Sequence, residues 1–541
     1  MDSADRPVYN VGDNVPPSVL VLSILQHFFV LAVYMTYPVI ITKAINGGED
    51  LSTFLISATL IGSGIATILQ AIRYTGCGYI FPMVPNSSYL PASMLAATAG
   101  GLPLLYGMMC VSGFLEMILS RLTRYFRVLF PGEVVGVVMF MLGLAIIPFS
   151  FPLFFGSGDT GPLDPAATAV GIITLGSMII LGIQHQKIFR FYAVLIGIII
   201  GFASSVLFGV LTLADIESAG STSLFSIPNP VGIVSYSFDV GLLIPFAIGM
   251  LCVMLKSAGN IALLDEYTGE TGRGNLRRGI LSEGFGAAVC SAIGGIGIGS
   301  SASNTGLIPG TGIASRKIGL GLGLFLIICG FLPAIGWFFH IMPEPIMGAV
   351  VIYAIAFIML GGVQSISSRV LDNRRTFVVI LPIMIGVSSV MCPNLYTALP
   401  ETIQFFFASP LTSGAIFVVV LGLLFKIGLP THNTVRFGDH PEADVARLLL
   451  DCGRLWTMDK TQMFQIIHHI QALIRAMPDG MHPEQLTLTL KNSTGALTAE
   501  LVVPGPVDET AMKSAGHYPA TVTIAATDAG KTIIRSGYLM I

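Results

Sequence analysis

The chain has 541 residues, of which 53% are hydrophobic and only 11% are charged, and its mean hydropathy is +0.80. A soluble domain carries about 25% charged residues, so this composition excludes an ordinary water-soluble protein. The net charge of −3 favours no class of partner, and the seven cysteines lack the CxxC spacing of a metal site. No hydrolase triad, nucleotide-binding loop or basic patch stands out, so we expect neither an enzyme nor a nucleic-acid partner.

Long apolar runs follow one another from Pro16 to Lys426. Each run is near the length of about 20 residues that crosses a bilayer as a helix. The runs predict an all-α polytopic membrane protein with about fourteen transmembrane segments. Their expected positions are 16–43, 51–72, 79–99, 102–120, 132–155, 166–184, 190–213, 239–263, 279–297, 300–314, 318–340, 343–364, 376–392 and 411–428.

The charges between these segments indicate how the chain is oriented. Short cytoplasmic loops are enriched in lysine and arginine. With the N-terminus inside, the inner loops hold bases such as Arg121 and Arg316, and the outer loops hold acids such as Glu49 and Glu344. Lys43 is the single base near an outer loop. We expect a multi-pass protein of the inner (cytoplasmic) membrane whose N- and C-termini are both cytoplasmic.

The composition changes after about residue 430. The stretch from Arg436 to Met477 reads as two amphipathic helices, and the later stretches alternate like strands. We predict a transmembrane transporter unit over 1–429 and a small cytoplasmic α+β domain over 430–541. Helices are expected before strands, which argues against a sulfate-transporter-type regulatory domain, because that domain begins with a strand. His468 and His469 are interpreted as ordinary helix surface or core rather than a metal site.

Two segments are unusually rich in glycine, proline and serine. They are GYIFPMVPNSSYLPASM at 78–94 and GIGIGSSASNTGLIPGTG at 295–312. Each is the third segment of its half, so the chain reads as two repeats of seven segments, over about 16–213 and 239–428. An odd number of segments per repeat gives the halves inverted topology. Paired broken segments in inverted halves are typical of a transporter's midplane site.

The broken backbone itself indicates binding. Unpaired N–H and C=O groups cannot face lipid, so they persist only where they meet protein, water or substrate. Half-helix N-termini then offer hydrogen-bond donors and a partial positive charge to a ligand. The alternative is that these segments are packing surfaces, since small residues also mediate close helix contacts. The GLGLG run at 319–323 is interpreted as close packing and not as a phosphate loop.

Several motifs, in this order, resemble one family. They are LQHFF with its Gln-His pair, PNSSYLP with its Ser-Ser-aromatic sequence, and SNTGLIPGTG with its Asn-x-Gly followed by threonine. The matching residues are Gln26, His27, Ser87, Ser88, Tyr89, Asn304, Gly306 and Thr311. On these motifs the chain resembles the nucleobase–ascorbate transporters, also called nucleobase:cation symporter-2 or xanthine/uracil permeases. The stretches LFPGEVVGVVMFMLGLAI and RRGILSEGFGAAVCSAIGG are also similar. The resemblance covers about residues 16–428 and not the C-terminal domain.

This resemblance implies a permease for a nucleobase such as xanthine, uracil or urate. It implies inverted seven-segment repeats, a core domain and a gate domain, an elevator-like alternating-access movement and, usually, a homodimer in the bilayer. It implies a small-molecule substrate and no cofactor, and it leaves coupling to H+ or Na+ open.

Two places depart from the family's pattern. Members usually carry a glutamate in the eighth segment and a polar residue four positions on, and here these are Lys256 and Asn260. The residue before Asn304 is usually Gln or Glu, and here it is Ser303. A carboxylate accepts hydrogen bonds from ring N–H groups, whereas a charged lysine only donates. The expected site has thus changed from acceptor to donor and from negative to positive, which weighs against the usual proton symport.

The expected substrate contacts lie on both broken segments and on the first and eighth segments. A lysine inside an apolar span indicates function, with snorkelling to the inner interface as the alternative. Tyr89 is expected either to stack on a flat ring or to fill the core, and Glu116 to lie near the membrane interface. The substrate-binding set is Lys256, Asn260, Ser303, Asn304, Tyr89, Ser88 and His27, supported by Gln26, Gly306 and Thr311.

The expected function is therefore a membrane permease for a nucleobase. The lysine favours an anionic or carbonyl-rich molecule of the urate or xanthine kind. Two alternatives stay open. One is a transporter of a small anion, such as a carboxylate, bicarbonate or sulfate, on the same fold. The other is a transporter-derived membrane sensor, which the loss of the usual acids supports.

Overall fold

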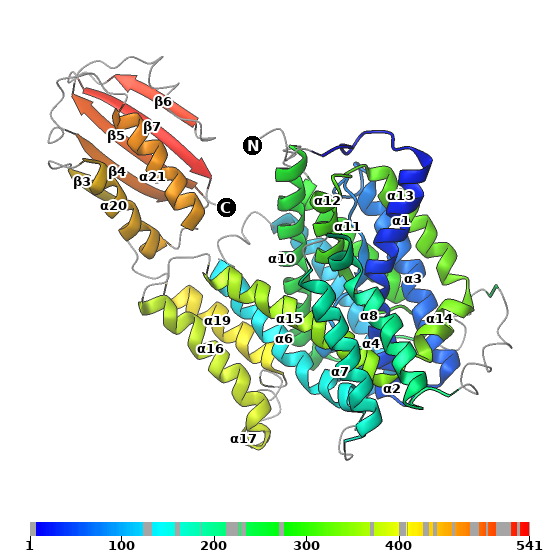
Figure 1. Ribbon diagram of the computed structural model, residues 1–541. Helices are drawn as coiled ribbons and strands as arrows, with labels where there is room; N and C mark the ends of the chain where they lie inside the picture. The colour runs from blue at the N-terminus through cyan, green and yellow to red at the C-terminus, as the bar shows by residue number, and fades with distance from the viewer. Residues whose placement is uncertain are drawn as a thin grey trace. The chain divides into compact units, whose positions relative to one another are not determined.

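A computed structural model gives the arrangement of the chain (Figure 1). Its residues form two compact units. The first unit comprises residues 1–123, 139–360 and 386–413, and the second comprises residues 124–138, 361–385 and 414–541. The structure describes residues 7–122, 132–156, 163–184, 187–212, 225–226, 228, 234–269, 275–367, 373–399, 407, 409–425, 432–436, 441–456, 460–475, 486–493, 496–504, 521–526 and 531–539. The expected boundary between two domains at 429 and 430 stays a prediction.

In the apolar part of the chain, the described regular elements are helices apart from two three-residue strands. Its short 3-10 helices are η2 Val33–Met35, η3 Ser120–Leu122 and η5 Val240–Leu242. Its α-helices are α1 Pro17–Ala32, α2 Thr36–Ala44, α3 Glu49–Ala71, α4 Leu90–Leu119, α6 Gly132–Phe155, α7 Pro165–Gly182, α8 Lys187–Leu207, α10 Leu243–Thr268, α11 Asn275–Ala292, α12 Ala302–Thr311, α13 Arg316–Gly330, α14 Pro333–His340, α15 Glu344–Ser367, α16 Asn373–Met391, α17 Pro393–Thr397 and α19 Pro410–Leu424.

Many of these helices are long enough to cross a membrane. Among the described residues, eight pass on length and apolar composition, and the pair α13 and α14, bent by 79°, makes up to nine. The chain is therefore a multi-pass membrane protein. Some of the expected transmembrane segments are not separate membrane-spanning helices in the structure. The third and fourth are merged in α4, whose backbone breaks at Gly101 with φ 70°, and α12 has only 10 residues. The number of about fourteen stays a prediction.

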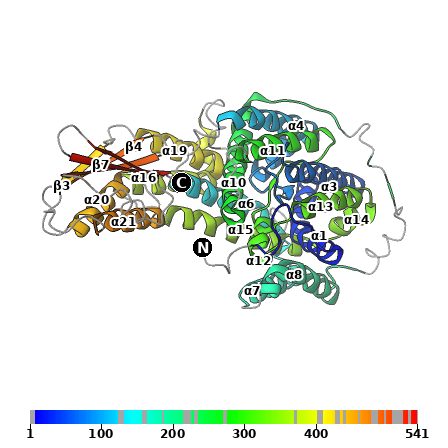
Figure 2. The same ribbon diagram turned by 90° about the horizontal axis from the view of Figure 1, so that it is seen from above.

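Close contacts at glycine join helices from the two halves of the chain. A Cβ on Gly64 of α3 would stand 2.5 Å from the carbonyl oxygen of Gly323 on α13. A Cβ on Gly284 of α11 would stand 2.7 Å from the carbonyl oxygen of Gly113 on α4. Figure 2 shows α3 beside α13 and α4 beside α11. The close packing expected of the run at 319–323 is confirmed, because small residues let these backbones approach.

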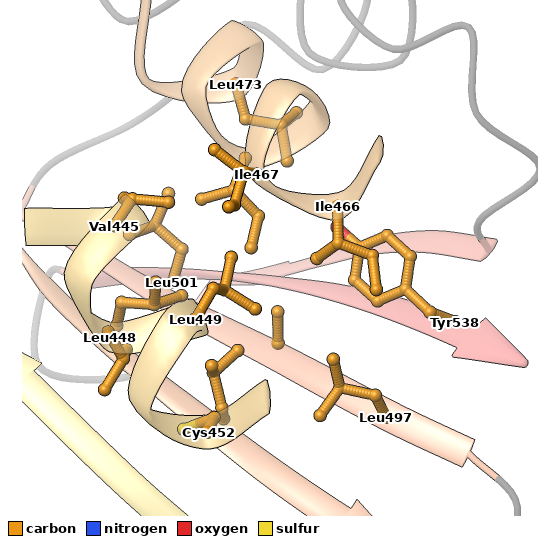
Figure 3. Close-up of a cluster of buried hydrophobic side chains, with 14 of the residues drawn as sticks. Val445, Leu448, Leu449, Cys452, Ile466, Ile467, Leu473, Leu497, Leu501 and Tyr538 are labelled. Atoms are coloured by element: carbon orange, nitrogen blue, oxygen red, sulfur yellow. The ribbon is translucent and has the colours of Figure 1, made fainter. Parts of the chain in front are cut away.

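The second unit contains a five-stranded antiparallel sheet in the order β3-β4-β5-β7-β6. Alternate residues of three strands pack against two helices, so that Leu449, Ile466, Leu501 and Tyr538 meet in one apolar core (Figure 3). The elements are β3 His432–Arg436, α20 Pro441–Trp456, α21 Lys460–Arg475, β4 Thr487–Ser493, β5 Ala496–Pro504, β6 Thr521–Ala526 and β7 Lys531–Leu539. Its expected place in a separate cytoplasmic domain stays a prediction.

The expected order of elements in this region is wrong. The strand β3 precedes both helices and pairs with β4, from His432 opposite Lys491 to Arg436 opposite Thr487. Its sequence, HNTVR, has a single aliphatic residue, because an edge strand pairs on one side only and need not carry an apolar alternation. The element order therefore no longer argues against a sulfate-transporter-type domain.

The two histidines of α21 lie as expected, one on the surface and one in the core. His468 is exposed, and His469 is buried with its Nδ1 atom 2.7 Å from the hydroxyl oxygen of Tyr538. No group of three or more metal-ligating side chains occurs in the described part of the chain.

Candidate substrate-binding site

The two broken segments meet as a pair of short strands, which we call the ladder. β1 (Met83–Pro85) and β2 (Ile298–Ser300) pair antiparallel, with Met83 opposite Ser300 and Pro85 opposite Ile298. Every residue of both strands is buried. Pairing satisfies backbone groups that lipid could not satisfy. The segments expected to bind substrate, far apart in sequence, thus come together at one place.

Gly299 makes this crossing possible. A Cβ at that position would stand 2.4 Å from Asn86 Nδ2 and 2.7 Å from Val253 Cγ1. Contacts under 3 Å are closer than real side chains tolerate. Glycine is therefore required where the backbone of the second segment approaches both the first segment and α10.

A helix follows each strand of the ladder. α12 begins after Ser301, whose Oγ accepts hydrogen bonds from Asn304 N at 3.3 Å and from Asn304 Nδ2 at 3.1 Å. α4 begins at Leu90 after a turn in which Asn86 Oδ1 accepts a hydrogen bond from Ser88 N at 3.1 Å. The first part of α4 ends at the break at Gly101. Both half-helices therefore direct their N-termini, with their partial positive charge, towards the ladder.

The first segment is tied to the second broken segment by two expected residues. His27 Nδ1 lies 2.8 Å from Asn304 Oδ1, and both side chains are buried. The contact fixes α1 against the start of α12. Gln26, next to His27, is partly buried.

Helix α10 brings the expected Lys256 and Asn260 to the ladder. Lys256 Nζ donates a hydrogen bond to Asn86 Oδ1 at 3.3 Å. Asn260 Nδ2 donates to Ser300 Oγ at 3.0 Å. Because residues four apart share a helix face, one face of α10 binds both broken segments. Lys256 is partly buried and its ammonium group lies at the ladder, whereas the alternative of snorkelling would place it at the membrane interface.

Glu283 on α11 is a member of this network that the sequence analysis missed. Its Oε1 atom accepts hydrogen bonds from Ser257 Oγ at 2.7 Å and from Ser300 N at 2.8 Å. Ser257 Oγ also lies 2.6 Å from Ser300 Oγ. Glu283 is fully buried. An acid within an apolar run was the available signal, and it is the same signal that singled out Lys256.

Glu116 on α4 is also buried, so the expectation that it lies near the membrane interface is wrong. Its relative exposure is 0%, and its carboxyl group interacts with the carboxyl group of Glu283 and the hydroxyl group of Tyr89. The position of Glu116 near the inner end of the expected segment 102–120 had suggested that it lies at the membrane interface. The contact between α4 and α11 at Gly113 and Gly284 encloses the side chain instead, since a Cβ on Gly284 would stand 2.9 Å from Glu116 Cβ.

The remaining expected residues differ in exposure. Tyr89 is buried between Gly249 and Gly297, and its hydroxyl oxygen accepts a hydrogen bond from Ser112 Oγ at 3.4 Å. Ser303 and Gly306 are exposed on α12, where Ser303 Oγ lies 3.1 Å from Tyr34 OH. Ser88 is buried next to Tyr89 in the chain. Thr311 Oγ1 donates a hydrogen bond to Leu307 O at 2.9 Å. Gln26 is partly buried. Their roles in binding stay predictions.

A cavity of about 460 Å³ lies elsewhere in the first unit. Its charged lining includes Lys43 and Glu344, whose side chains form an ion pair at 3.0 Å, together with Glu49 and Asp164. None of the residues of the ladder network lines it. We therefore place the candidate substrate site at the ladder, where the polar side chains of α1, α10, α11 and both broken segments converge.

Comparison with known proteins identifies the family of the chain. The xanthine/uracil permease family model, described as "Permease family", matches residues 18–395. The chain belongs to the xanthine/uracil permease family. The match spans α1 to α17 and contains every residue of the ladder network.

The chain is similar to named permeases at low sequence identity. The xanthine permease XanQ of Escherichia coli (strain K12) is 25% identical over 79% of this chain and 96% of its own. The uric acid permease PucJ of Bacillus subtilis (strain 168) is 24% identical over 74% of this chain and 92% of its own. Among solved structures, the transmembrane domain of the cyanobacterium bicarbonate transporter BicA covers 76% of this chain and 98% of that chain, with a TM-score of 0.48 and 14% identity.

Proposed function

We propose that this chain is a multi-pass permease that carries a nucleobase across the cytoplasmic membrane. Its family and the names of its relatives, a xanthine permease and a uric acid permease, support the proposal. The observation that carries it is the ladder, where Lys256, Asn260 and Glu283 converge on two broken segments inside an apolar protein. Polar groups are retained at such depth where they serve a substrate pathway.

The chemistry at the ladder favours an oxopurine of the xanthine or urate kind. The Lys256 ammonium offers donors, and the two half-helix N-termini add a partial positive charge. The fully buried carboxyl group of Glu283 adds an acceptor. An oxopurine presents both carbonyl oxygens and ring N–H groups, so it matches a site that holds donors and an acceptor together.

The proposed mechanism is alternating access of the elevator type. The ladder is joined by hydrogen bonds to α10 and α11 and, through Asn304, to α1. A network of this kind favours movement of these elements as one body. The proposal includes fourteen segments in two inverted repeats, a core domain and a gate domain, a homodimer, and cytoplasmic N- and C-termini.

Uptake by the purified chain in liposomes tests this function. We expect uptake of radiolabelled xanthine, with competition by unlabelled xanthine and urate, weaker competition by uracil, and none by bicarbonate, sulfate or acetate. Uptake that responds only to the small anions would replace this proposal with an anion transporter. Binding of xanthine without any flux would favour a membrane sensor.

Substitution of the site lysine tests where the base binds. Lys256→Glu exchanges a donor for an acceptor, so we expect competition by urate to fall about tenfold or more while competition by uracil is kept or rises. Lys43→Glu is the matched control, because Lys43 pairs with Glu344 at the cavity away from the ladder. It should leave the order of competitors unchanged. An equal effect of both substitutions would remove Lys256 from the binding site.

A further inference from the structure

Asn86 carries a buried hydrogen-bond donor that the fold leaves unused. The residue directly follows the strand β1 and is only 3% exposed. Its amide nitrogen, Nδ2, has no hydrogen-bond partner among the described residues. A buried donor without an acceptor costs free energy, and buried polar side chains in proteins are usually paired. The amide nitrogen of Asn86 is therefore a candidate for contact with a ligand.

Two other donors set the orientation of this amide. Lys256 Nζ donates a hydrogen bond to Asn86 Oδ1 at 3.3 Å, and Ser88 N donates to the same atom at 3.1 Å. If the amide were turned by half a rotation, its NH2 group would face both donors, and neither could form its hydrogen bond. The oxygen of the amide is therefore fixed towards Lys256 and Ser88 N, and the NH2 group is directed away from them.

The NH2 group is directed towards Gly299 at the ladder. Asn86 Nδ2 lies 2.4 Å from the position that a Cβ on Gly299 would occupy, and Val253 Cγ1 lies 2.7 Å from that position. Glycine has no side chain and valine has an aliphatic one, so neither side chain offers an acceptor. The unused donor thus lies where both broken segments and α10 meet, which is the proposed substrate site.

Neighbouring donors at the ladder are already paired within the protein. Asn260 Nδ2 donates to Ser300 Oγ at 3.0 Å, and Ser257 Oγ donates to Glu283 Oε1 at 2.7 Å. Asn86 Nδ2 differs from them, because it needs an acceptor from outside the described part of the chain. The N-terminus of α4, which follows this turn, favours an acceptor with a negative or partial negative charge. The carbonyl oxygen of an oxopurine meets both conditions.

We propose that Asn86 binds the substrate directly and that its Nδ2 donates a hydrogen bond to one carbonyl oxygen of an oxopurine. Lys256 then also acts as a positioning residue, because it holds the amide oxygen and so presents the NH2 group to the base. The inference rests on the proposed function and adds a residue that determines specificity. A base without an acceptor at this place leaves the donor unpaired, and a site built for a hydrogen bond discriminates strongly against such a ligand.

Replacing one oxygen of the base at a time tests this contact. Binding of radiolabelled xanthine to the purified full-length chain is measured with competing xanthine and with two analogues, in which sulfur replaces one carbonyl oxygen or the other. Sulfur is a weaker hydrogen-bond acceptor than oxygen. The wild type should bind one of the two analogues about tenfold more weakly than xanthine.

Asn86→Ser should remove this discrimination. A serine hydroxyl can take the place of the asparagine oxygen in a turn, but it carries no group at the position of Nδ2. The variant should bind xanthine about tenfold more weakly than the wild type does. It should no longer distinguish xanthine from the analogue that the wild type rejects. A role of Asn86 in folding alone would not make binding depend on one particular oxygen of the base.

Two amide-to-acid substitutions separate binding from folding. Asn86→Asp keeps the oxygen that Lys256 and Ser88 N bind but replaces the NH2 group by an acceptor. Xanthine affinity should fall about tenfold or more, while the unfolding temperature stays within a few degrees of the wild type. Gln70→Glu is the matched control, because Gln70 is also buried but its Nε2 donates to Gly279 O at 2.8 Å. It should lower the unfolding temperature, while the protein that remains folded keeps its affinity for xanthine.

Each outcome decides either this inference or the proposed function. The inference is overturned if the wild type rejects neither analogue, or if both Asn86 variants keep the wild-type affinity and discrimination. It is also overturned if neither variant folds, because the amide then serves the fold. In these cases the permease stands as long as the wild type carries xanthine into liposomes. A wild type that neither binds nor carries an oxopurine would overturn the proposed function, and this inference with it.

Discussion

The two broken segments occupy equivalent places in the two halves of the chain, but they differ in exposure. The first arm, residues 83–100, is buried from the ladder to Met94. The second arm, residues 298–311, is buried at the ladder but exposes Ala302, Ser303 and Gly306 along one edge of α12. Sequence symmetry therefore gives the two arms the same position without giving them the same role.

The anchoring contacts of the arms explain this difference. The first arm is held by Tyr89, whose ring packs between Gly249 and Gly297. The second arm is held at the ladder through Ser300 and at the start of α12 through Asn304, and one edge of α12 beyond these contacts is exposed. We infer that the first arm is the fixed side of the site and that a substrate approaches along the exposed edge of α12.

The largest expected effect separates two glycines of the second arm. Gly299→Ala places a methyl group 2.4 Å from Asn86 Nδ2, so the ladder must open. We expect a loss of stability of about 1–3 kcal/mol and loss of xanthine uptake. Thermal unfolding and uptake of the purified variant measure both.

Gly306→Ala is the control for that substitution. Nothing lies within 4 Å of a Cβ at Gly306, and alanine favours a helix by about 1 kcal/mol over glycine. Stability should be kept or rise slightly. A folded Gly306→Ala that has lost uptake would show that the open edge of α12 is where substrate or a moving element passes. Equal tolerance of both substitutions would contradict the tight ladder.

The next effect compares neighbouring residues at the start of α12. Asn304→Ala leaves the buried His27 Nδ1 without its partner, which costs about 1–3 kcal/mol, and frees α12 from α1. We expect a clear fall in unfolding temperature and in uptake. Ser303→Ala removes a contact of an exposed hydroxyl with Tyr34, so its stability should change by less than about 0.5 kcal/mol.

A double-mutant cycle checks the reason for that difference. His27→Ala breaks the same bond from the other side, so His27→Ala/Asn304→Ala should cost less than the sum of the two single variants. Additive losses would mean that the hydrogen bond is not what fixes the second arm. A Ser303→Ala variant that keeps its stability but loses uptake would assign a direct contact with substrate to that hydroxyl.

How far the sequence predicts this site depends on the range of the interaction. Glycine, proline and serine content at matching places was enough to find both arms, and the family motif was enough to select His27 and Asn304. The strands β1 and β2 have three residues each, too few to show an alternating pattern. Their pairing is a contact between distant parts of the chain, which no local pattern encodes.

Glu283 was missed, and Glu116 was wrongly expected near the membrane interface, for a related reason. Glu283 and Glu116 each stand alone in an apolar run, and a single acid carries no signal of what it faces. Glu283 binds Ser257 and Ser300 on two other elements, so its role becomes visible only once those elements are placed. The edge strand β3 was not predicted, because its pairing with β4 and not its own sequence makes it a strand.

The smallest expected effect concerns Tyr89 and decides whether its ring only supports the site. The hydrogen bond from Ser112 Oγ is 3.4 Å long, which is weak, so Tyr89→Phe should change stability by less than about 1 kcal/mol and leave xanthine uptake nearly unchanged. Tyr89→Leu removes the ring that fills the space between Gly249 and Gly297, and it should destabilise the chain by about 3 kcal/mol or less. If the ring is only a support, the uptake that survives in Tyr89→Leu should keep the wild-type affinity for xanthine, because fewer folded molecules lower the maximal rate alone. A rise in the KM for xanthine with stability intact would instead mean that the ring stacks on the base.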